Sequence, residues 1–380
     1  MKFYRTLRDL LQFMQLPTDK RRLTFYSESE NYWPHLEGLV RGVLSISNID
    51  VCYISSGNND PGLYFKHPNY KSFEIDEGFV RDWLFENIKT DVMVMTMPDL
   101  HQYQVKKSKY KVHYVYVQHS LVSLHTTLRK GALDYYDTIF CAGPHHIKEI
   151  RAIEAKYHLP EKKIVAHGYG RLDAIIYESK KRLSKIKVTG NPTHILIAPS
   201  WGQNGTIESG VGEKVIGQLL AQGNQITFRP HPQTVKFSKR KVNAILKKFG
   251  NFSLFSYDAN VAGQESLHDS DIMISDWSSA ALDYAFGLNK PVLFIDVPQK
   301  INNDAYEALN LNPIEVEIRS LIGDILELDN IDQCGEYVNR LISKKINIKI
   351  SDYVYNIGSS ATEGCSALKK IITNNNYTDF

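Results

Sequence analysis

The sequence predicts an α/β protein of two doubly wound domains, whose parallel sheets face one another across a central cleft. Short strings of β-branched and aromatic residues alternate with helical patterns along the chain, and this alternation indicates right-handed βαβ units. A chain of 380 residues is long enough for two separate cores. Because ligands of this architecture bind at the carboxyl ends of strands, the residues that follow strands are the candidates for function.

We expect the first domain to span residues 1–185 and the second to span residues 186–350. Helical patterns include Trp33–Ser45 and His145–Tyr157 in the first domain, and Gly212–Gln222 and Ala280–Phe286 in the second. The expected strands are Leu23–Ser27, Asp50–Ser55, Asp91–Thr96, His113–Gln118, Thr138–Cys141 and Ile164–Ala166, then His194–Ala198, Gln225–Arg229, Phe252–Ser256, Ile272–Ser275 and Val292–Ile295.

The boundary is placed near residue 185 because Lys180–Thr193 is charged and contains a Gly-Asn-Pro turn before a new strand. We expect residues 351–380 to form a C-terminal helix that packs back on the first domain.

The N-terminal segment is basic, because the first 22 residues carry six basic and two acidic side chains. In this segment Leu7, Leu10, Leu11 and Met14 have helical spacing, so residues 1–20 predict a basic amphipathic helix. Such a helix packs on its own domain or lies on an anionic membrane surface, and we favour the first.

The composition is that of an ordinary globular protein, with 43% hydrophobic and 23% charged residues. It excludes a disordered chain, a fibre and a disulfide scaffold, and no apolar run reaches the roughly 18–20 residues of a membrane span. Four scattered cysteines without metal-type spacing, together with a charged N-terminus unlike a signal peptide, predict a cytoplasmic protein with reduced thiols. A net charge of +3 argues against nucleic acid as a partner.

The segment 272–283 carries the most informative motif. A buried strand ends at Ser275, and a polar turn leads into a helix that begins near Ser278 or Ser279. Serine is a good N-cap, and the free N–H groups of a helix start bind anions, so these hydroxyls suit a phosphate or pyrophosphate. The alternative is a capping motif without a ligand. Asp276 is placed with this donor-binding turn, where its charge suits it to orienting the turn rather than to contacting phosphate.

A second motif is Arg229-Pro230-His231-Pro232, which ends another strand. The two prolines lack a ladder donor and fix the backbone around the histidine. Arg229 can bind phosphate oxygens in bidentate fashion. His231, if protonated, could stabilise charge on a leaving phosphate.

In the first domain His119 directly follows a strand, which is a suitable place for a general base. Ser120 and His125 lie beyond it, and the resemblance given below implies that they belong to the acceptor side. Two further loops follow strands: Gly168 and Arg171 lie in His167–Asp173, and Ser200 and Trp201 lie in Ala198–Gly205. We expect these loops to contact a nucleotide, although Gly-rich turns are common.

The ordered set HS at 119–120, GYGRLD at 168–173, APSW at 198–201, RPHP at 229–232 and SDWSSAALDYAFGLNKP at 275–291 resembles the CDP-glycerol glycerophosphotransferases of teichoic-acid and capsule synthesis. The similarity covers about residues 22–370, and FYSESENYWPH at 25–35 resembles a compact branch of that family. Two positions differ from the family pattern. Ser120 stands where the family commonly has glycine, and Gly202 stands where a basic residue often follows the tryptophan.

The resemblance implies a GT-B fold of two Rossmann-type domains. It implies transfer of glycerol phosphate, or a related polyol phosphate, from a CDP-linked donor to a hydroxyl of a glycan or lipid-linked acceptor, with release of CMP. His119 would be the base, and Arg229, His231, Ser275, Ser278 and Ser279 would hold the donor phosphates. No cofactor is required by this chemistry, a divalent metal is left open, and the membrane surface is an expected partner.

Two other functions fit the same residues. A GT-B glycosyltransferase that uses a nucleotide sugar would need much the same phosphate cradle. A non-catalytic nucleotide- or carbohydrate-binding protein is the lesser alternative, because His119, Arg229, His231 and the serine-rich helix start are all present. The sequence lacks a GxxxxGK[ST] phosphate loop, an HExxH zinc motif and a GxSxG elbow.

Overall fold

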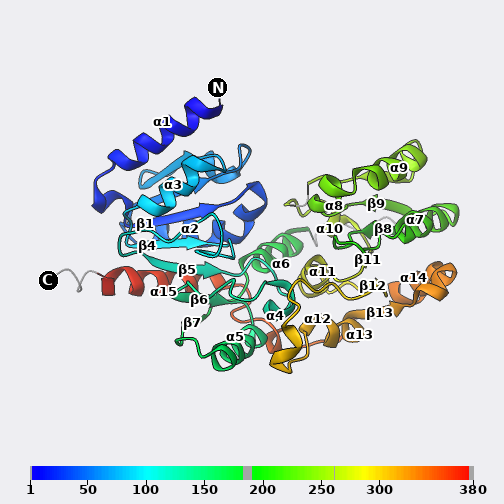
Figure 1. Cartoon of the computed structure of the whole chain (residues 1–380). Helices are drawn as coiled ribbons and strands as arrows, with labels where there is room; N and C mark the ends of the chain where they lie inside the picture. Colours follow the sequence, from blue (N-terminus) through cyan, green and yellow to red (C-terminus); the bar gives the residue numbers. More distant parts are fainter. Residues whose placement is uncertain (1, 183–190, 261, 376–380) are drawn as a thin grey trace.

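The computed structural model describes residues 2–182, 191–260 and 262–375. It contains two parallel sheets, one in each of two lobes (Figure 1). The N-terminal lobe has the strand order β3-β2-β1-β4-β5-β6-β7, and the C-terminal lobe has the order β10-β9-β8-β11-β12-β13. The predicted fold class is therefore confirmed. The predicted boundary near residue 185 lies outside the described residues.

The N-terminal lobe is built from strands β1 to β7, helices α1 to α6 and the final helix α15. Its strands are β1 Leu23–Ser27, β2 Val51–Ser55, β3 Tyr70–Glu74, β4 Val92–Met95, β5 His113–Val117, β6 Thr138–Cys141 and β7 Lys163–Ala166. Its helices are α1 Lys2–Gln15, α2 Trp33–Ile46, α3 Phe79–Asn87, α4 Leu124–Thr127, α5 Pro144–Tyr157, α6 Gly170–Arg182 and α15 Ser360–Asn375.

The C-terminal lobe contains the remaining elements. Its strands are β8 His194–Ile197, β9 Gln225–Phe228, β10 Phe255–Tyr257, β11 Ile272–Ser275, β12 Val292–Ile295 and β13 Gly323–Leu326. Its helices are α7 Val211–Ala221, α8 Pro232–Phe237, α9 Lys239–Phe249, α10 Glu265–Asp269, α11 Ser279–Leu288, α12 Ile314–Glu317, α13 Arg319–Ile322 and α14 Cys334–Ile342.

Apolar runs form the central strands because helices cover both faces of each sheet. In the N-terminal lobe Tyr26, Met95 and Tyr116 belong to the core on one face. On the other face Phe25 and Val94 pack in the core that α2 and α15 complete. The alternation along each strand therefore separates two apolar layers, and both are buried.

The structure differs from the sequence prediction at the sheet edges. Strands β3 and β13 were not predicted, and β10 begins three residues later than expected. All three lie at an edge of their sheet. Edge strands are short and carry polar residues, as in YKSFE at 70–74 and GDIL at 323–326, so their local pattern is weak.

Helix α1 packs on its own lobe. Phe13 is fully buried and its ring lies edge-to-face on Phe73, with the ring centroids 5.3 Å apart. Asp9 Oδ2 accepts a hydrogen bond of 2.8 Å from Glu74 N. Of the predicted apolar face, Leu10 is buried but Leu11 is 59% exposed, because the buried face is rotated toward Asp9 and Phe13.

The C-terminal helix α15 lies against α2 (Figure 1). Its residues Leu368, Ile371 and Ile372 are buried in the core of the N-terminal lobe. The contact is close at Gly42, where a Cβ atom would come within 2.5 Å of Cys365 Sγ. The end of the chain therefore completes the lobe in which the chain begins.

The two lobes meet where α6 packs on α11 (Figure 1). Leu172 and Ile175 of α6 share one apolar cluster with Ala281 and Phe286 of α11. Gly287 lets the helices approach, since a Cβ atom there would lie 2.5 Å from Ile175 Cγ2. This shared core holds the carboxyl ends of the two sheets at one junction.

Candidate functional site

In the C-terminal lobe Asp276 organises the loop that follows β8. Its Oδ1 accepts a hydrogen bond of 2.6 Å from Ser200 N. Its Oδ2 accepts bonds from Thr206 N at 3.2 Å and from Thr206 Oγ1 at 2.8 Å. Asp276 thus ties the loop of Ser200 and Trp201 to the end of β11, which agrees with the orienting role expected from its charge.

The start of α11 has the predicted capping geometry. Ser278 is the N-cap, and its side chain accepts a hydrogen bond from Ala280 N. Ser279 is the first helical residue and is half-buried. Ser275 is arranged differently from the prediction, because it is fully buried and its Oγ donates 2.8 Å to Ala198 O. Its hydroxyl proton is used in a hydrogen bond between β11 and the end of β8 and is not available to a ligand. Of the three serines, Ser278 and Ser279 remain suited to a phosphate.

Arg229 lies at the end of β9 and is 5% exposed. Its Nη1 donates a hydrogen bond of 3.0 Å to Ser266 Oγ, and its Nη2 donates one of 3.3 Å to the Gly263 carbonyl oxygen. Burial lowers the pKa of Arg229 to about 10, and the charge of Arg171 adds to this effect. The guanidinium is therefore still charged at neutral pH, and it is held in place from two sides.

His231 is neutral at neutral pH, so the condition set in the sequence analysis, a protonated ring, is not met. Burial lowers its pKa to about 3, and the charge of Lys300 adds to the shift. Its Nδ1 accepts a hydrogen bond of 3.1 Å from Gln233 N. An accepting Nδ1 places the proton of the neutral ring on Nε2. His231 can therefore donate one hydrogen bond to a phosphate but supplies no charge.

Lys300 supplies a positive charge next to His231, and the sequence analysis did not select it. Its Nζ lies 4.4 Å from the centroid of the Trp201 ring, and that ring stacks on His231 with centroids 6.1 Å apart. Burial lowers the pKa of Lys300 to about 8, although the negative charges of Asp276 and Glu208 raise it. In the family pattern a basic residue often follows this tryptophan, but here Gly202 stands at that position. The cation beside Trp201 is Lys300, which belongs to the loop after β12.

In the N-terminal lobe His119 follows β5, as predicted. Its Nδ1 lies 3.3 Å from Tyr116 Oη, and its ring lies edge-to-face with Tyr32, with the centroids 5.5 Å apart. Burial lowers the pKa of His119 to about 4, against a smaller opposite effect of a hydrogen bond with the Thr96 backbone. The ring is neutral at neutral pH and can accept a proton. Beside it, Ser120 Oγ accepts 3.2 Å from Val122 N.

A chain of contacts connects His119 to Arg229. Tyr169 Oη donates 3.1 Å to the His119 carbonyl. Two residues later, Arg171 Nε donates 3.0 Å to Asp283 Oδ2 on α11. The charges of Arg171 and Asp283 both act on Arg229. The predicted residues His119, Arg171 and Arg229 are thus brought to one junction between the lobes.

Two predicted site residues serve packing in the structure. Gly168 has φ +97°, and a Cβ atom there would lie 2.5 Å from the Tyr355 carbonyl and 2.9 Å from Ser360 Cβ. It is required for the approach of the returning C-terminal segment. His125 is 1% exposed, with Nδ1 3.3 Å from Glu149 Oε1 and Nε2 3.2 Å from Leu311 O. Its ring therefore joins α4 to α5 and to the C-terminal lobe, not to an open acceptor surface.

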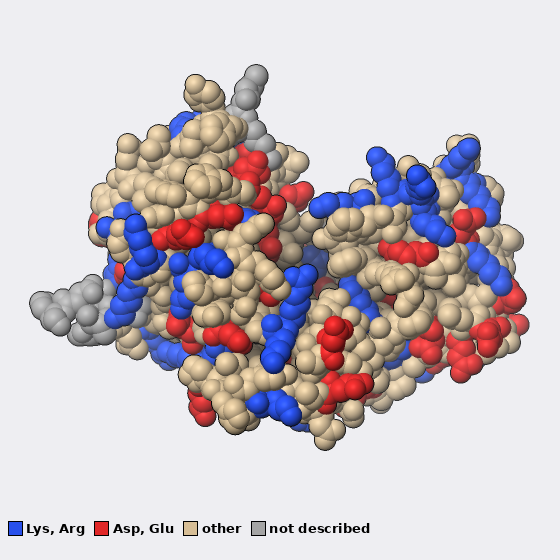
Figure 2. Space-filling view, viewed as in Figure 1, with Lys and Arg blue, Asp and Glu red and all other residues tan. Residues whose placement is uncertain are grey.

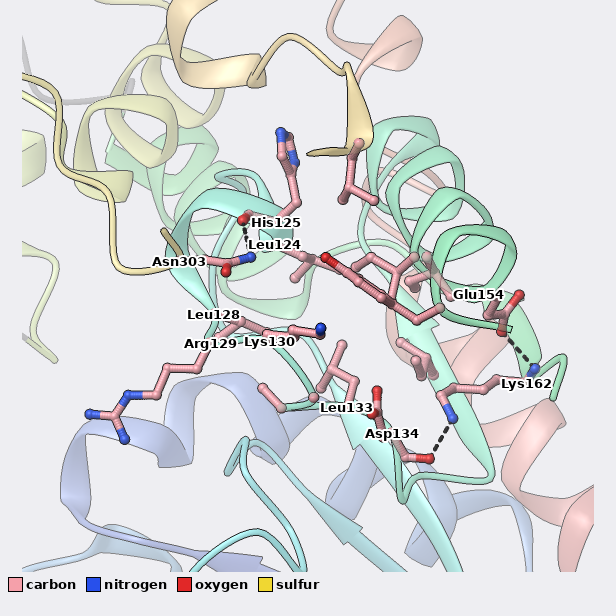
Figure 3. Close-up of a pocket in the computed structure, with 17 residues that line it drawn as sticks. Leu124, His125, Leu128, Arg129, Lys130, Leu133, Asp134, Glu154, Lys162 and Asn303 are labelled. Atoms are coloured by element: carbon pink, nitrogen blue, oxygen red, sulfur yellow. Dashed lines mark hydrogen bonds between the residues drawn. The ribbon is translucent and has the colours of Figure 1, made fainter. Parts of the chain in front are cut away.

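A small cavity lies beside His125 (Figure 3). Leu124, Leu128 and Leu133 line it, and Asn303 closes one side by donating 2.8 Å from Nδ2 to the His125 carbonyl. Its volume of about 40 Å³ has room for only a few water molecules. The cavity is too small for a nucleotide or a sugar, so it is not the substrate site.

A hollow lies between the two lobes (Figure 2). Asp and Glu side chains gather on the N-terminal lobe at the rim of this hollow, whereas Lys and Arg side chains gather on the upper part of the C-terminal lobe. Among the described residues no group of three or more His, Cys, Asp or Glu could hold a metal ion.

Residues 123–307 match the family model described as CDP-Glycerol:Poly(glycerophosphate) glycerophosphotransferase. The resemblance to this family is confirmed. The matched residues include Arg171, Ser200, Arg229, His231 and the start of α11. No sequence among the curated proteins matches the chain.

Solved structures of similar architecture include the wall teichoic acid polymerase TagF, with 14% identity over 99% of this chain and 98% of that chain, and a TM-score of 0.57. UDP-GlcNAc 2-epimerase from Neisseria meningitidis, bound to UDP-GlcNAc, has 14% identity over 92% and 99% of the two chains and a TM-score of 0.60. The epimerase from Methanocaldococcus jannaschii has 17% identity over 93% and 99%, and a TM-score of 0.57. At these identities the likeness shows the fold, which is GT-B-like. The family match supports a transferase.

Proposed function

We propose that this protein transfers glycerol phosphate, or a related polyol phosphate, from a CDP-linked donor to a hydroxyl of a glycan or lipid-linked acceptor in cell-surface polymer synthesis. The observation that carries the proposal is the junction of His119 with Arg229 through Tyr169, Arg171 and Asp283. It brings a neutral base from one sheet to a fixed guanidinium from the other. Phosphoryl transfer needs this combination of positioning and charge stabilisation.

In the proposed reaction the acceptor oxygen attacks the phosphorus that carries the polyol. The P–O bond to the bridging oxygen breaks, and CMP leaves with that oxygen. The acceptor proton passes to the neutral His119 ring, which its depressed pKa keeps free to accept it. The positive charges of Arg229 and Lys300 stabilise the negative charge that develops on the CMP phosphate. His231 donates a hydrogen bond to this phosphate through Nε2–H.

The start of α11 supports the same assignment of the donor side. Ser278 satisfies one backbone N–H at the helix start, and the remaining free N–H groups of a first helical turn attract anions. The Asp276 carboxylate is occupied by three hydrogen bonds from the Ser200 and Thr206 loop. Because its oxygens are engaged there, a donor phosphate meets the hydroxyls and amides of the turn.

The experiment is release of CMP from CDP-glycerol, measured with and without lipid-linked acceptor extracted from bacterial membranes. We expect acceptor-dependent CMP release in the wild type and its loss in His119→Ala and His231→Ala. CDP-ribitol serves as the second donor. Release of UMP or UDP from a sugar nucleotide, with none of CMP from either CDP-polyol, would replace the proposal with the glycosyltransferase alternative. Binding of a nucleotide without turnover of any donor would favour a non-catalytic binding protein.

We also propose a cytoplasmic protein that associates with the membrane surface through α1 and α9. Phe3, Tyr4 and Leu11 of α1 are 65%, 83% and 59% exposed. The basic residues of α9, such as Lys241 and Lys247, are exposed, and Figure 1 shows both helices along the same side of the molecule. Apolar side chains beside basic ones suit an anionic lipid surface. No helix among the described residues has the length and apolarity to cross a bilayer.

Co-sedimentation with vesicles of anionic lipid tests this association. Removal of the whole N-terminal helix is a poor variant, because Phe13 is part of the core. The double substitution Phe3→Ser and Leu11→Ser leaves the buried face of α1 intact. We expect it to reduce the bound fraction on vesicles that retain wild type. Equal binding of the two proteins would contradict a role for α1.

A further inference from the structure

Several buried polar atoms without a hydrogen-bond partner lie in the N-terminal lobe, on Gln118 and on two carboxyl groups that act on Tyr116, whose ring contacts His119. Among the described residues, Glu28 Oε2, Asp99 Oδ1 and Gln118 Nε2 are buried in this lobe and have no hydrogen-bond partner. Gln118 is 3% exposed. A buried polar group that lacks a hydrogen bond is costly, so such atoms are rare unless a ligand satisfies them. Two acceptors and one donor near the same residue indicate a ligand that itself both donates and accepts.

The strand register places the ends of β1, β4 and β5 side by side. Tyr26 pairs with Met95, and Met95 pairs with Tyr116, and these three side chains belong to the same core. Glu28 and Gln118 are the first residues after β1 and β5, and Met97 lies two residues after the end of β4. All three therefore lie at the carboxyl ends of adjacent strands, which is where ligands of this architecture bind.

The charged groups around Glu28 act on one another. Burial raises the pKa of Glu28 to about 7, and the charges of Glu77 and Asp99 raise it further, whereas Arg81 lowers it. Burial likewise raises the pKa of Asp99. The Arg81 guanidinium is engaged with Asp82, to which Nε donates at 3.0 Å. A phosphate would be repelled by this acidic group, whereas neutral hydroxyls would be bound.

We propose that Glu28 and Gln118 position the acceptor, with the Glu28 carboxylate accepting a hydrogen bond from an acceptor hydroxyl and the Gln118 amide donating to an adjacent oxygen. The group held there is a neutral polyol or sugar, and His119 lies next to it, one residue beyond Gln118. This inference rests on the proposed transferase function and assigns residues to its acceptor side. Both residues are positioning residues, because His119 takes the proton.

The test compares Glu28→Gln with wild type in acceptor-dependent release of CMP from CDP-glycerol, over a range of concentrations of the membrane-derived lipid acceptor. We expect the acceptor KM to rise about 10- to 100-fold, the effect of one hydrogen bond to a charged group. The donor KM and the increase in Tm caused by CDP-glycerol should not change. Glu86→Gln, on the exposed surface of α3, is the matched control and should behave as wild type.

Gln118→Met provides a second variant of similar size that removes the amide, and with it the donor, and it should raise the acceptor KM in the same way. An unchanged acceptor KM in a folded Glu28→Gln protein would overturn the proposal. So would loss of the CDP-glycerol shift in Tm in both variants, because the residues would then support the fold rather than the acceptor. Failure of the proposed function is distinct, since it would appear in the wild type as absence of CMP release.

Discussion

Arg171 and Asp283 form a buried ion pair that joins the two lobes, with Arg171 Nε 3.0 Å from Asp283 Oδ2. Arg171 begins α6, and Asp283 lies within α11. The pair sits between His119 and Arg229, which come from different sheets. Its integrity therefore affects whether His119 and Arg229 keep their relative positions.

Asp283→Asn should destabilise the protein by about 3–5 kcal/mol, because the substitution leaves the buried Arg171 charge without its carboxylate. Urea denaturation followed by circular dichroism measures the change. The control is Asp324→Asn, which removes the partner of the exposed Arg340 and should cost about 1 kcal/mol or less. Equal losses in the two variants would show that the inter-lobe pair contributes no more than a surface pair.

The acceptor kcat/KM should depend on two ionisations on the N-terminal lobe. Glu28 has a pKa of about 7 and faces Glu77, Arg81, Asp99 and Tyr32. Its carboxylate binds a hydroxyl more strongly than its neutral form, so kcat/KM should rise as the pH increases through about 7. His119, with a pKa of about 4, must be neutral to accept a proton, so it limits the rate only near pH 4.

The pH profiles of wild type and Glu28→Gln test this assignment. In Glu28→Gln the rise near pH 7 should disappear, and only the fall near pH 4 should remain. Persistence of the inflection near pH 7 in the variant would assign it to another group. The control Glu86→Gln should keep the wild-type profile.

His231→Ala should lower kcat by about 10²- to 10³-fold, which is the effect of removing one preorganised hydrogen-bond donor. Because the pKa of His231 is about 3, its protonation contributes no inflection between pH 5 and 8. The ratio of wild-type to variant kcat should therefore be constant over that range. A ratio that falls as the pH rises through about 6.5 would show instead that a protonated imidazole acts in the reaction.

Lys300→Met should weaken donor binding without changing the acceptor KM. Burial lowers the pKa of Lys300 to about 8, so its charge is present at pH 7 and is lost as the pH rises through about 8. Asp276, Glu208 and His231 are the ionisable groups that act on it or respond to it. We expect the CDP-glycerol shift in Tm to be smaller at pH 9 than at pH 7 in the wild type.

Two matched variants sharpen this experiment. Lys300→Arg should keep the donor-induced shift at pH 9, because arginine stays charged. Lys344→Met, which removes an exposed partner of Asp324, should leave the shift and its pH dependence unchanged. A Lys300→Met protein that binds CDP-glycerol as wild type does would remove Lys300 from the donor side.

The interior of the fold could be predicted from the sequence, whereas two of its four edge strands could not. Val92–Met95 and Val292–Ile295 are continuous apolar runs because both faces of a central parallel strand are buried. Strands β3 and β13 lie at the edges, where Lys71 and Asp324 interrupt the pattern. Local sequence cannot distinguish such segments from loops.

The same limit applies to the site. His119, Arg229 and Ser278 follow strands, so the topology alone brings them to the junction. Glu28 also follows a strand, but the sequence does not reveal its burial beside other charges. Lys300 carries no local signal, and only its burial beside other charges marks it. Gly168 also follows a strand, but the segment that covers its loop comes from residue 355 onward, which no local pattern reveals.

The contact of α15 with α2 has a consequence for synthesis on the ribosome. The core beneath α2 needs Leu368 and Ile371, which are translated after every strand of the second lobe. The first lobe therefore emerges with one apolar surface uncovered, and this surface is buried only after the last helix has been synthesised. The sheet of the second lobe, by contrast, is complete by Leu326. Nascent chains stalled before residue 360 should bind hydrophobic-patch chaperones that release the full-length protein.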